Sequence, residues 1–385
     1  MHARQRWLID YRLDETLGSK PAMRQSTPEP GTGRAPSGVE AIRWRDGALT
    51  LLDQRRLPAE ETWLDMPDLD TAAAAIRDLV VRGAPAIGIT AAYACVLAMR
   101  ARSAEHRGND RAAREAWLAD LDRLVAARPT AVNLRWAVDR MRAAAGQGDV
   151  VAAQERLERL AAAIHAEDQA ANRRMAELGA DLIEPGSRVL THCNTGSLAT
   201  GGTGTALGVI VNAWRSERLA RVFACETRPW FQGLRLTAWE FAREGVRCSV
   251  LVESAAAGLM QRGEIDWVIT GADRITANGD VANKVGTLML ASLARQFGVK
   301  MMVVAPVSTL DAETASGDLI EIEERPADEI WGSVGMTAPP GVDAYNPVFD
   351  VTPAELIDFI VTDRGVLEPP YEGRIAELVR AADAA

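Results

Sequence analysis

Two residues of this sequence stand where their side chains could exchange protons with a ligand. Cys193 lies in the turn 191–196, directly after the apolar run 188–192, and Asp273 lies in the turn 271–274, directly after the apolar run 267–270. A cysteine near a helix amino terminus can have a lowered thiol pKa, and a carboxylate beside apolar residues can have a raised pKa. The pattern therefore predicts acid–base chemistry at Cys193 and Asp273.

Both residues also have a structural interpretation, which the sequence alone leaves open. A lone cysteine is more often a small, buried apolar side chain. Asp273 could instead cap a helix or form an ion pair with Arg274. The glycine-rich segment 200–205 has the same two interpretations, because it either approaches an anion at the start of the helix predicted over 206–214 or simply makes a tight connection.

Arg82 begins a segment suited to an anionic ligand. It precedes Gly83 and Ala84, whose main-chain amides are free at the start of a helix marked by Pro85. A guanidinium binds two phosphate oxygens as a fork. The segment therefore predicts a phosphate clamp.

Asn283 and Lys284, predicted to open a helix, add an amide and a cation for a phosphate or a hydroxyl. Gln232, at a predicted sheet edge, could hydrogen-bond sugar hydroxyls. Taken alone, Lys284 is more typical of a surface, and Arg128, between two predicted helices, is more typical of a structural turn.

The composition limits the kinds of partner. The 385 residues include 43 basic and 53 acidic side chains, a net charge of −10, which argues against nucleic acid or an anionic membrane. The four histidines are scattered and the four cysteines form no CxxC pair, so we predict no metal. The segment 1–20 does not resemble an export signal, so a reducing cytoplasm is expected. The weakly polar run 83–99 is predicted to be a packed helix rather than a membrane span.

The fold class predicted by the pattern is α/β, in two domains preceded by a flexible extension over 1–38. A short β-hairpin around Asp46 and Gly47 opens a mainly helical amino-terminal domain, 39–183. In 184–385, short apolar runs alternate with helical segments, which is typical of a Rossmann-like, doubly wound parallel sheet. The predicted helices cover about 69–80, 85–101, 110–126, 130–145 and 150–180, and the predicted strands 188–192, 221–226, 248–253, 267–270 and 300–305.

Taken together, these segments resemble the methylthioribose-1-phosphate isomerase family from about Ala41 to Tyr371. The resemblance rests on 41–44, 52–55, 81–88, 128–134, the turn 191–196, 226–233, 271–274, 283–287 and 346–353. It implies that Asp273 is the acid or base and that Cys193 assists at the reacting carbons. The substrate-binding residues that it implies are Arg82, Gly83, Ala84, Arg128, Gln232, Asn283 and Lys284.

The resemblance implies an intramolecular oxidoreductase, an aldose–ketose isomerase that acts in methionine salvage as a cytoplasmic homodimer without a cofactor. It would convert 5-methylthioribose 1-phosphate to 5-methylthioribulose 1-phosphate. Asp273 would protonate the ring oxygen, and hydrogen would then move from C2 to C1, either as a proton through an enolate or as a hydride.

Three other functions stay open. A related isomerase could act on 5-deoxyribose 1-phosphate or ribose 1,5-bisphosphate, because the motifs say little about the group on C5. The family is also related to regulatory subunits of the translation-initiation guanine-nucleotide exchange factor, which are not expected to keep both the Cys193 and the Asp273 turn. A nucleotide-dependent oxidoreductase is disfavoured, because no predicted strand leads into a GxGxxG segment.

Overall fold

An antiparallel meander opens the amino-terminal part of the fold. The computed structural model describes residues 25–26, 39–128, 131–147 and 149–383. Asp46 and Gly47 both have positive φ, 50° and 76°, as a two-residue hairpin turn requires, so the predicted hairpin is confirmed. The strands of this sheet are β1 (Gln25–Ser26), β2 (Ile42–Arg45), β3 (Ala48–Leu52) and β4 (Trp63–Met66).

Of the extension predicted over 1–38, only β1, which pairs with β4, lies within the described residues. The rest of that prediction lies outside them.

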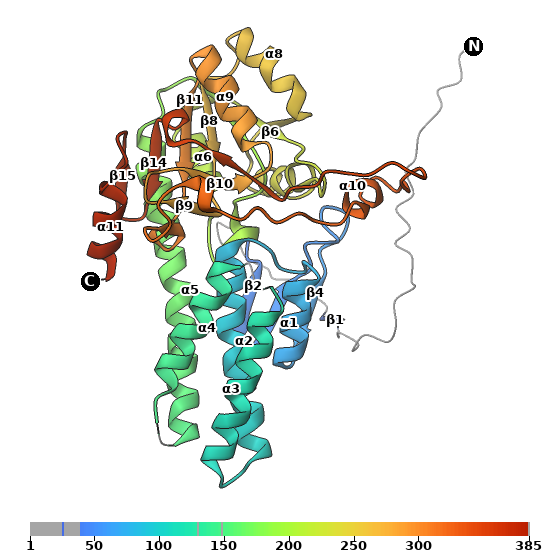
Figure 1. Ribbon diagram of the computed structural model, residues 1–385, viewed down its shortest axis with the longest axis vertical. Coiled ribbons are helices and arrows are strands. Elements are labelled where there is room, and N and C mark those ends of the chain that lie inside the picture. Colours follow the sequence, from blue (N-terminus) through green and yellow to red (C-terminus); the bar gives the residue numbers. More distant parts are fainter. Residues whose placement is uncertain (1–24, 27–38, 129–130, 148, 384–385) are drawn as a thin grey trace.

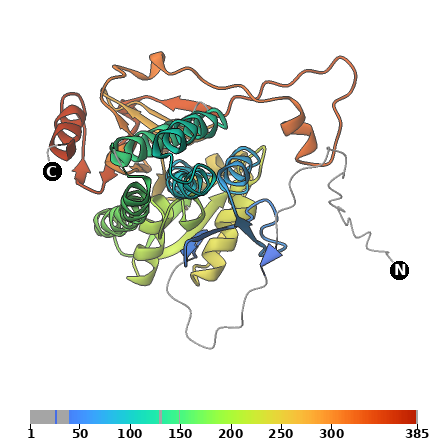
Figure 2. The ribbon, with the colours of Figure 1, turned by 90° about the horizontal axis from the view of Figure 1, so that it is seen from below.

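Five helices follow, and they confirm the predicted helical amino-terminal part. Their bounds are α1 (Leu69–Arg77), α2 (Ala84–Glu105), α3 (Asp110–Ala126), α4 (Val132–Ala145) and α5 (Val150–Asp181). In the described part of the chain, α2 is the one helix long and apolar enough to cross a membrane, but 78% of its most apolar window is buried inside the fold. It is therefore packed among the other helices, as its sequence predicts (Figure 2).

A seven-stranded sheet forms the second part of the fold (Figure 1). Its strand order is β15-β14-β11-β8-β5-β6-β7, and every pairing is parallel except that of the edge strand β15. The chain passes from β5 to β6 and β7 on one side and then to β8 on the other. The point between β5 and β8 is therefore where a doubly wound sheet binds ligands.

The strands of this sheet are β5 (Ser187–Thr191), β6 (Leu219–Cys225), β7 (Cys248–Leu251), β8 (Trp267–Thr270), β11 (Lys300–Val304), β14 (Phe359–Thr362) and β15 (Gly365–Leu367). The helices in this part of the chain are α6 (Ala206–Arg215), α7 (Ala238–Arg243), α8 (Ala256–Gln261), α9 (Thr287–Phe297), α10 (Asp328–Gly332) and α11 (Arg374–Asp383), and α10 lies on an extended arm away from the sheet (Figure 1).

A small four-stranded sheet, which the sequence does not predict, lies beside the carboxyl end of β8. Its strands are β9 (Arg274–Thr276), β10 (Val281–Lys284), β12 (Leu310–Asp311) and β13 (Phe349–Thr352). The prediction that Asn283 and Lys284 open a helix is wrong, because both lie in β10, and α9 begins only at Thr287. The pairing of β10 with the distant β13 decides this, and a local pattern does not reveal such a pairing.

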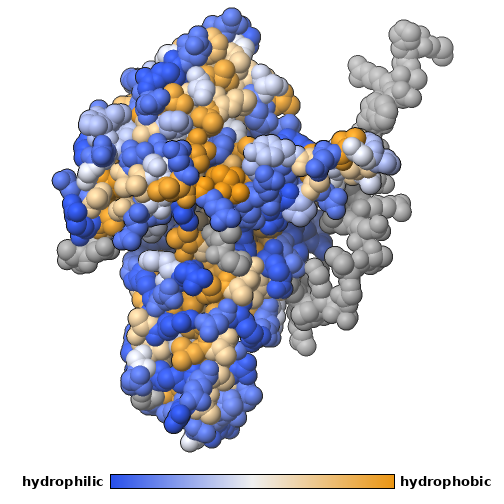
Figure 3. Space-filling view, viewed as in Figure 1, coloured by the Kyte–Doolittle hydropathy of each residue, from blue (hydrophilic) through white to orange (hydrophobic). Residues whose placement is uncertain are grey.

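The apolar core is divided between the two parts of the fold. One cluster of buried side chains runs from Ala41 to Ile164 and also includes Leu198 and Leu236, and two others fill the faces of the seven-stranded sheet. Helix α5 contributes Ile164 to the first cluster and Met175 to another, so one helix links both parts (Figure 1). The domain boundary at 183 therefore stays a prediction. On the face seen in Figure 3, hydrophobic side chains gather where the helical part meets the sheet.

Candidate active site

Three neighbouring strands end side by side at the candidate site. Thr191 in β5 is in register with Ile269 in β8 and with Ala224 in β6. Cys193 follows β5, and Asp273 follows β8. The parallel pairing therefore brings together the two turns that the sequence singles out, at the switch point of the sheet.

Cations surround these two side chains. The charges of Lys284, Arg128 and Arg82 act on the Asp273 carboxyl, and those of Arg82 and Lys284 also act on the Cys193 thiol. Burial nevertheless outweighs the cations and raises the pKa of Asp273. The five side chains thus form one cluster, although Arg82 and Asp273 are 191 positions apart in the sequence.

Neither structural interpretation of Asp273, as a helix cap or as the ion-pair partner of Arg274, agrees with the structure. Its N–H donates to the Ala282 carbonyl, 3.0 Å away, and the strand β9 follows it, so Asp273 does not cap a helix. Arg274 forms its ion pair with Asp311, at 3.6 Å. The carboxyl of Asp273 is therefore left facing the cations.

Cys193 has an unusual main-chain conformation for a residue other than glycine. Its φ is 61°, in the left-handed region. The thiol is free and buried, with 8% of the residue exposed, and burial raises its pKa even though Arg82 and Lys284 favour the thiolate. Burial therefore favours the protonated thiol over the thiolate at this position.

Arg82 reaches the Cys193 turn from the start of α2. One of its Nη atoms donates to the Asn194 carbonyl at 2.8 Å. A side chain on Gly83 would lie 2.6 Å from Ala199, so only glycine lets the start of α2 approach the turn so closely. Ala84 is the first residue of α2. The predicted placement of this segment beside an anion site is thus consistent with the geometry.

Several buried polar atoms at this edge have no hydrogen-bond partner among the described residues. They are Arg82 Nε and Nη2, Asn194 Oδ1, Thr195 Oγ1, Gln232 Oε1 and Thr270 Oγ1. Buried polar groups are rarely left unpaired without a reason. A polar ligand with both donors and acceptors would satisfy this set.

The other predicted binding residues are placed less uniformly. Gln232 is buried directly before the five-residue π-helix η2 (Gly233–Thr237). Arg128 lies where the charges of Asp273 and Glu323 act on it. The Asn283 amide is buried and donates to Thr287 Oγ1 at 2.9 Å, so its nitrogen points to the start of α9 rather than to the cation cluster.

Glu240, in α7, is a buried carboxyl that the sequence did not single out. It accepts hydrogen bonds from Asn194 Nδ2 at 2.7 Å and from the Ser197 N–H at 2.6 Å, and burial raises its pKa to about 6. A side chain on Gly196 would lie 2.3 Å from this carboxyl. Glu240 therefore stabilises the Cys193 turn through these hydrogen bonds. Nothing in its local sequence distinguishes it from a surface glutamate.

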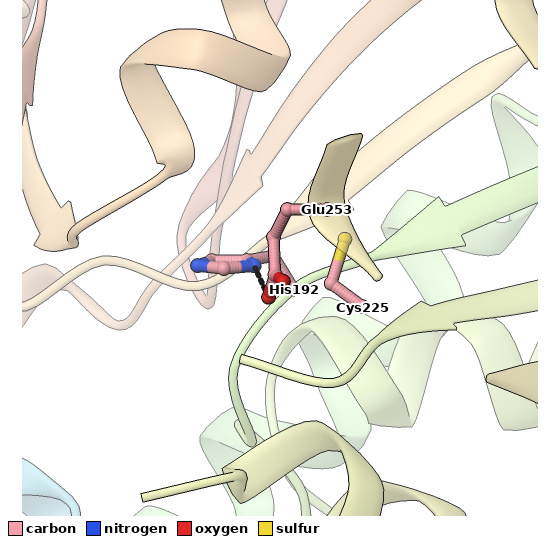
Figure 4. Close-up of side chains that lie close together, drawn as sticks. All are labelled: His192, Cys225 and Glu253. Carbon is pink, nitrogen blue, oxygen red and sulfur yellow. Dashed lines mark ion pairs between the residues drawn. The ribbon is translucent and has the colours of Figure 1, made fainter. Parts of the chain in front are cut away.

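His192, Cys225 and Glu253 form a cluster of the kind that can hold a metal ion, with potential ligand atoms within 4.8 Å of one another (Figure 4). His192 Nε2 donates to the Val285 carbonyl at 2.9 Å, so the neutral ring turns its Nδ1 lone pair towards Glu253, 3.9 Å away. Burial lowers the pKa of His192 to about 4 and raises that of the Cys225 thiol.

The potential metal ligands of this cluster are already engaged in other contacts or protonated. Glu253, for example, also accepts the Thr227 N–H at 2.5 Å. We interpret the cluster as a hydrogen-bonded support for the site. The absence of a bound metal stays a prediction.

Residues 80–369 match the Initiation factor 2 subunit family. The chain belongs to the Initiation factor 2 subunit family. Within this family, it is 55% identical over 349 residues to the methylthioribose-1-phosphate isomerase of Thioalkalivibrio sulfidiphilus, which covers 89% of this chain and 97% of that protein. It is 58% identical over 332 residues to the protein of the same name from Alkalilimnicola ehrlichii, with 86% and 94% covered.

Two solved structures have the same fold as this chain. The 5-methylthioribose 1-phosphate isomerase of Pyrococcus horikoshii superposes with a TM-score of 0.83 at 37% identity, over 89% of this chain and 96% of that chain. The translation initiation factor eIF-2B, subunit delta, from A. fulgidus superposes with a TM-score of 0.80 at 40% identity, over 89% and 99%. The predicted family and α/β fold are therefore confirmed.

Proposed function

We propose that this chain is a methylthioribose-1-phosphate isomerase, which converts 5-methylthioribose 1-phosphate to 5-methylthioribulose 1-phosphate. Relatives of that name are 55% and 58% identical over most of the chain. The observation that carries the proposal is the thiol of Cys193 close to the carboxyl of Asp273, with the charges of Arg82 and Lys284 acting on both groups. The cations suit the phosphate of the substrate, and the thiol and carboxyl suit hydrogen transfer between neighbouring carbons.

Asp273 starts the reaction in this proposal. Burial raises the pKa of its carboxyl, which favours the protonated form that donates to the furanose ring oxygen. The bond between that oxygen and C1 breaks, and positive charge develops at C1. Hydrogen then moves from C2 to C1, and the C2 hydroxyl returns a proton to the Asp273 carboxylate as the ketone forms. The carboxyl thus ends in the state in which it began.

The protonated thiol of Cys193 favours transfer of the hydrogen as a hydride, because a protonated thiol does not take a proton from C2. A reaction run in deuterated water tests this step. The product is expected to carry no solvent deuterium at C1. Deuterium at C1 would instead establish the enolate route, with the Cys193 thiolate as the base.

The substrate itself is tested by comparing three sugar phosphates. The value of kcat/KM is expected to be highest for 5-methylthioribose 1-phosphate and lower for 5-deoxyribose 1-phosphate and ribose 1,5-bisphosphate. A higher value for either of the other two would move the assignment to a related isomerase. The experiment is decisive because the phosphate and the anomeric carbon are shared, so only the group on C5 differs.

A regulatory subunit of a translation factor is the second candidate, favoured by the 40% identity to the translation initiation factor eIF-2B, subunit delta, from A. fulgidus. The Cys193 and Asp273 turns argue for the enzyme, since a binding subunit has no need of a buried thiol beside a carboxyl. Capture of nucleotide-exchange partners by a chain without isomerase activity would favour the subunit.

A cytoplasmic homodimer that acts in methionine salvage, with no nucleic acid and no membrane as partner, belongs to the same proposal. The four cysteines are free thiols, which suits a reducing compartment. Light scattering is expected to give twice the 41.5 kDa of one chain. A value near 41.5 kDa at micromolar concentration would contradict the dimer.

A further inference from the structure

The main chain of Cys193 is held at both of its polar groups by threonine hydroxyls. The Cys193 N–H donates to Thr227 Oγ1 at 2.9 Å, and the Cys193 carbonyl accepts from Thr237 Oγ1 at 2.7 Å. Both threonines are fully buried. They come from different elements, since Thr227 follows β6 and Thr237 ends the π-helix η2.

Each hydroxyl is fixed by further partners. Thr237 Oγ1 also accepts from Asn194 Nδ2 at 3.2 Å, so one hydroxyl holds two consecutive residues of the turn. Thr227 Oγ1 donates to the Cys225 carbonyl at 3.2 Å, and the Thr227 N–H donates to Glu253, whose carboxylate lies against His192 (Figure 4).

The conformation of Cys193 explains why these hydrogen bonds are needed. A residue other than glycine at a φ of 61° is in a sparsely populated region and persists only where its surroundings hold it. A different φ at this position would turn the thiol away from Asp273 and the cations. Thr227 has a φ of 63°, so the residue that accepts the Cys193 N–H is itself in the same unusual conformation.

We propose that Thr227 and Thr237 are positioning residues that clamp the main chain of Cys193 so that its thiol faces the reacting carbons. This proposal rests on the proposed isomerase function, because the reacting carbons are those of its substrate. The clamp acts through hydroxyls, so valine, which has nearly the same shape, abolishes it, whereas serine keeps it.

The test compares Thr227→Val, Thr237→Val, Thr227→Ser and Thr237→Ser in the full chain. Both valine variants are expected to lower kcat by roughly 10- to 100-fold, with KM within about twofold of the parent value, because small misplacements of a reacting group are costly. Both serine variants are expected to keep most of kcat. Thr362→Val is the matched control, since Thr362 is also a buried threonine at a strand end whose hydroxyl binds the main chain, at Gly365; kcat is expected to be unchanged.

Two results would overturn the clamp. One is a normal kcat in both folded valine variants, and the other is an equal loss in the serine and valine variants, which would point to packing of the methyl group. If Thr227→Val fails to fold, Thr237→Val and the two serine variants decide the question in the same way.

A second readout separates the clamp from the proposed function. The rate at which iodoacetamide alkylates Cys193 is followed against pH by peptide mass spectrometry. In the valine variants its midpoint is expected to move, because the thiol loses its fixed place in the buried site beside Arg82 and Lys284. If the parent chain has no isomerase activity, the proposed function is wrong, and an unchanged midpoint would then overturn the clamp as well.

Discussion

Replacement of Arg82 by lysine tests the phosphate clamp. One Nη atom of Arg82 donates to the Asn194 carbonyl, while its Nε and its other Nη are buried without a partner among the described residues. These two N–H groups form the fork that we expect to bind the substrate phosphate. Lysine keeps the positive charge but cannot supply the fork.

The expected loss follows from those two hydrogen bonds. A hydrogen bond to a charged group contributes about 1.5–3 kcal/mol. If lysine retains one contact and loses the other, binding weakens by about 3 kcal/mol at most, or roughly 100-fold in Kd. The Asn194 contact is also lost, so a smaller decrease in kcat is expected as well.

The assay measures initial rates over a range of substrate concentrations, together with the Kd for the substrate by titration calorimetry. Arg140→Lys is the control, because Arg140 binds Glu167 on the surface, at 2.8 Å. KM and Kd are expected to rise in Arg82→Lys and to stay unchanged in Arg140→Lys. A KM within twofold of the parent value in Arg82→Lys would refute the phosphate clamp at Arg82.

Four other substitutions have expected outcomes. Cys193→Ala and Asp273→Asn should each lower kcat by ~10²- to 10⁴-fold with an unchanged circular dichroism spectrum, and near-normal turnover in either would remove that residue from the chemistry. Gly271→Ala would bring a methyl group within 2.4 Å of Thr195 Cγ2 and should lower stability by about 1–3 kcal/mol, whereas Gly332→Ala, which meets nothing within 4 Å, should not; equal urea midpoints would contradict this. Burial lowers the pKa of His192 from 6.5 to about 4, so its stabilising contribution is complete above pH 6.5 and is lost as the pH falls towards 4, a loss of roughly 3 kcal/mol. Urea unfolding of the parent chain and of His192→Gln at pH 7 and pH 4.5 should show this loss in the parent only. The same loss of stability in both proteins would contradict the assignment.

Much of the fold could be predicted because its signals are local. The turn at Asp46 and Gly47, the alanine-rich helices and the short apolar strands are each visible within about a dozen residues. The predicted strand 267–270 agrees with β8 at both ends. The small sheet containing β10 could not be predicted in this way, because β10 lies between β9 and the distant β13.

The candidate site divides in the same manner. Cys193 and Asp273 stand out because each follows a strand, and parallel strands bring their carboxyl ends together. Thr227, Thr237 and Glu240 do not stand out, because their importance comes from hydrogen bonds to the Cys193 turn that join elements far apart in the sequence. Only the folded chain reveals that these common residue types are buried against a strained turn.

Conversion of 5-methylthioribose 1-phosphate by the purified chain is the most direct test of the proposed function. The purified chain is treated with a chelator and incubated with substrate labelled with ¹³C at C1, without added metal or nucleotide, and the C1 signal is followed by NMR. We expect the signal of the aldose phosphate to be replaced by that of the C1 methylene of 5-methylthioribulose 1-phosphate. No ketose signal, or the same rate of conversion by Asp273→Asn, would contradict it.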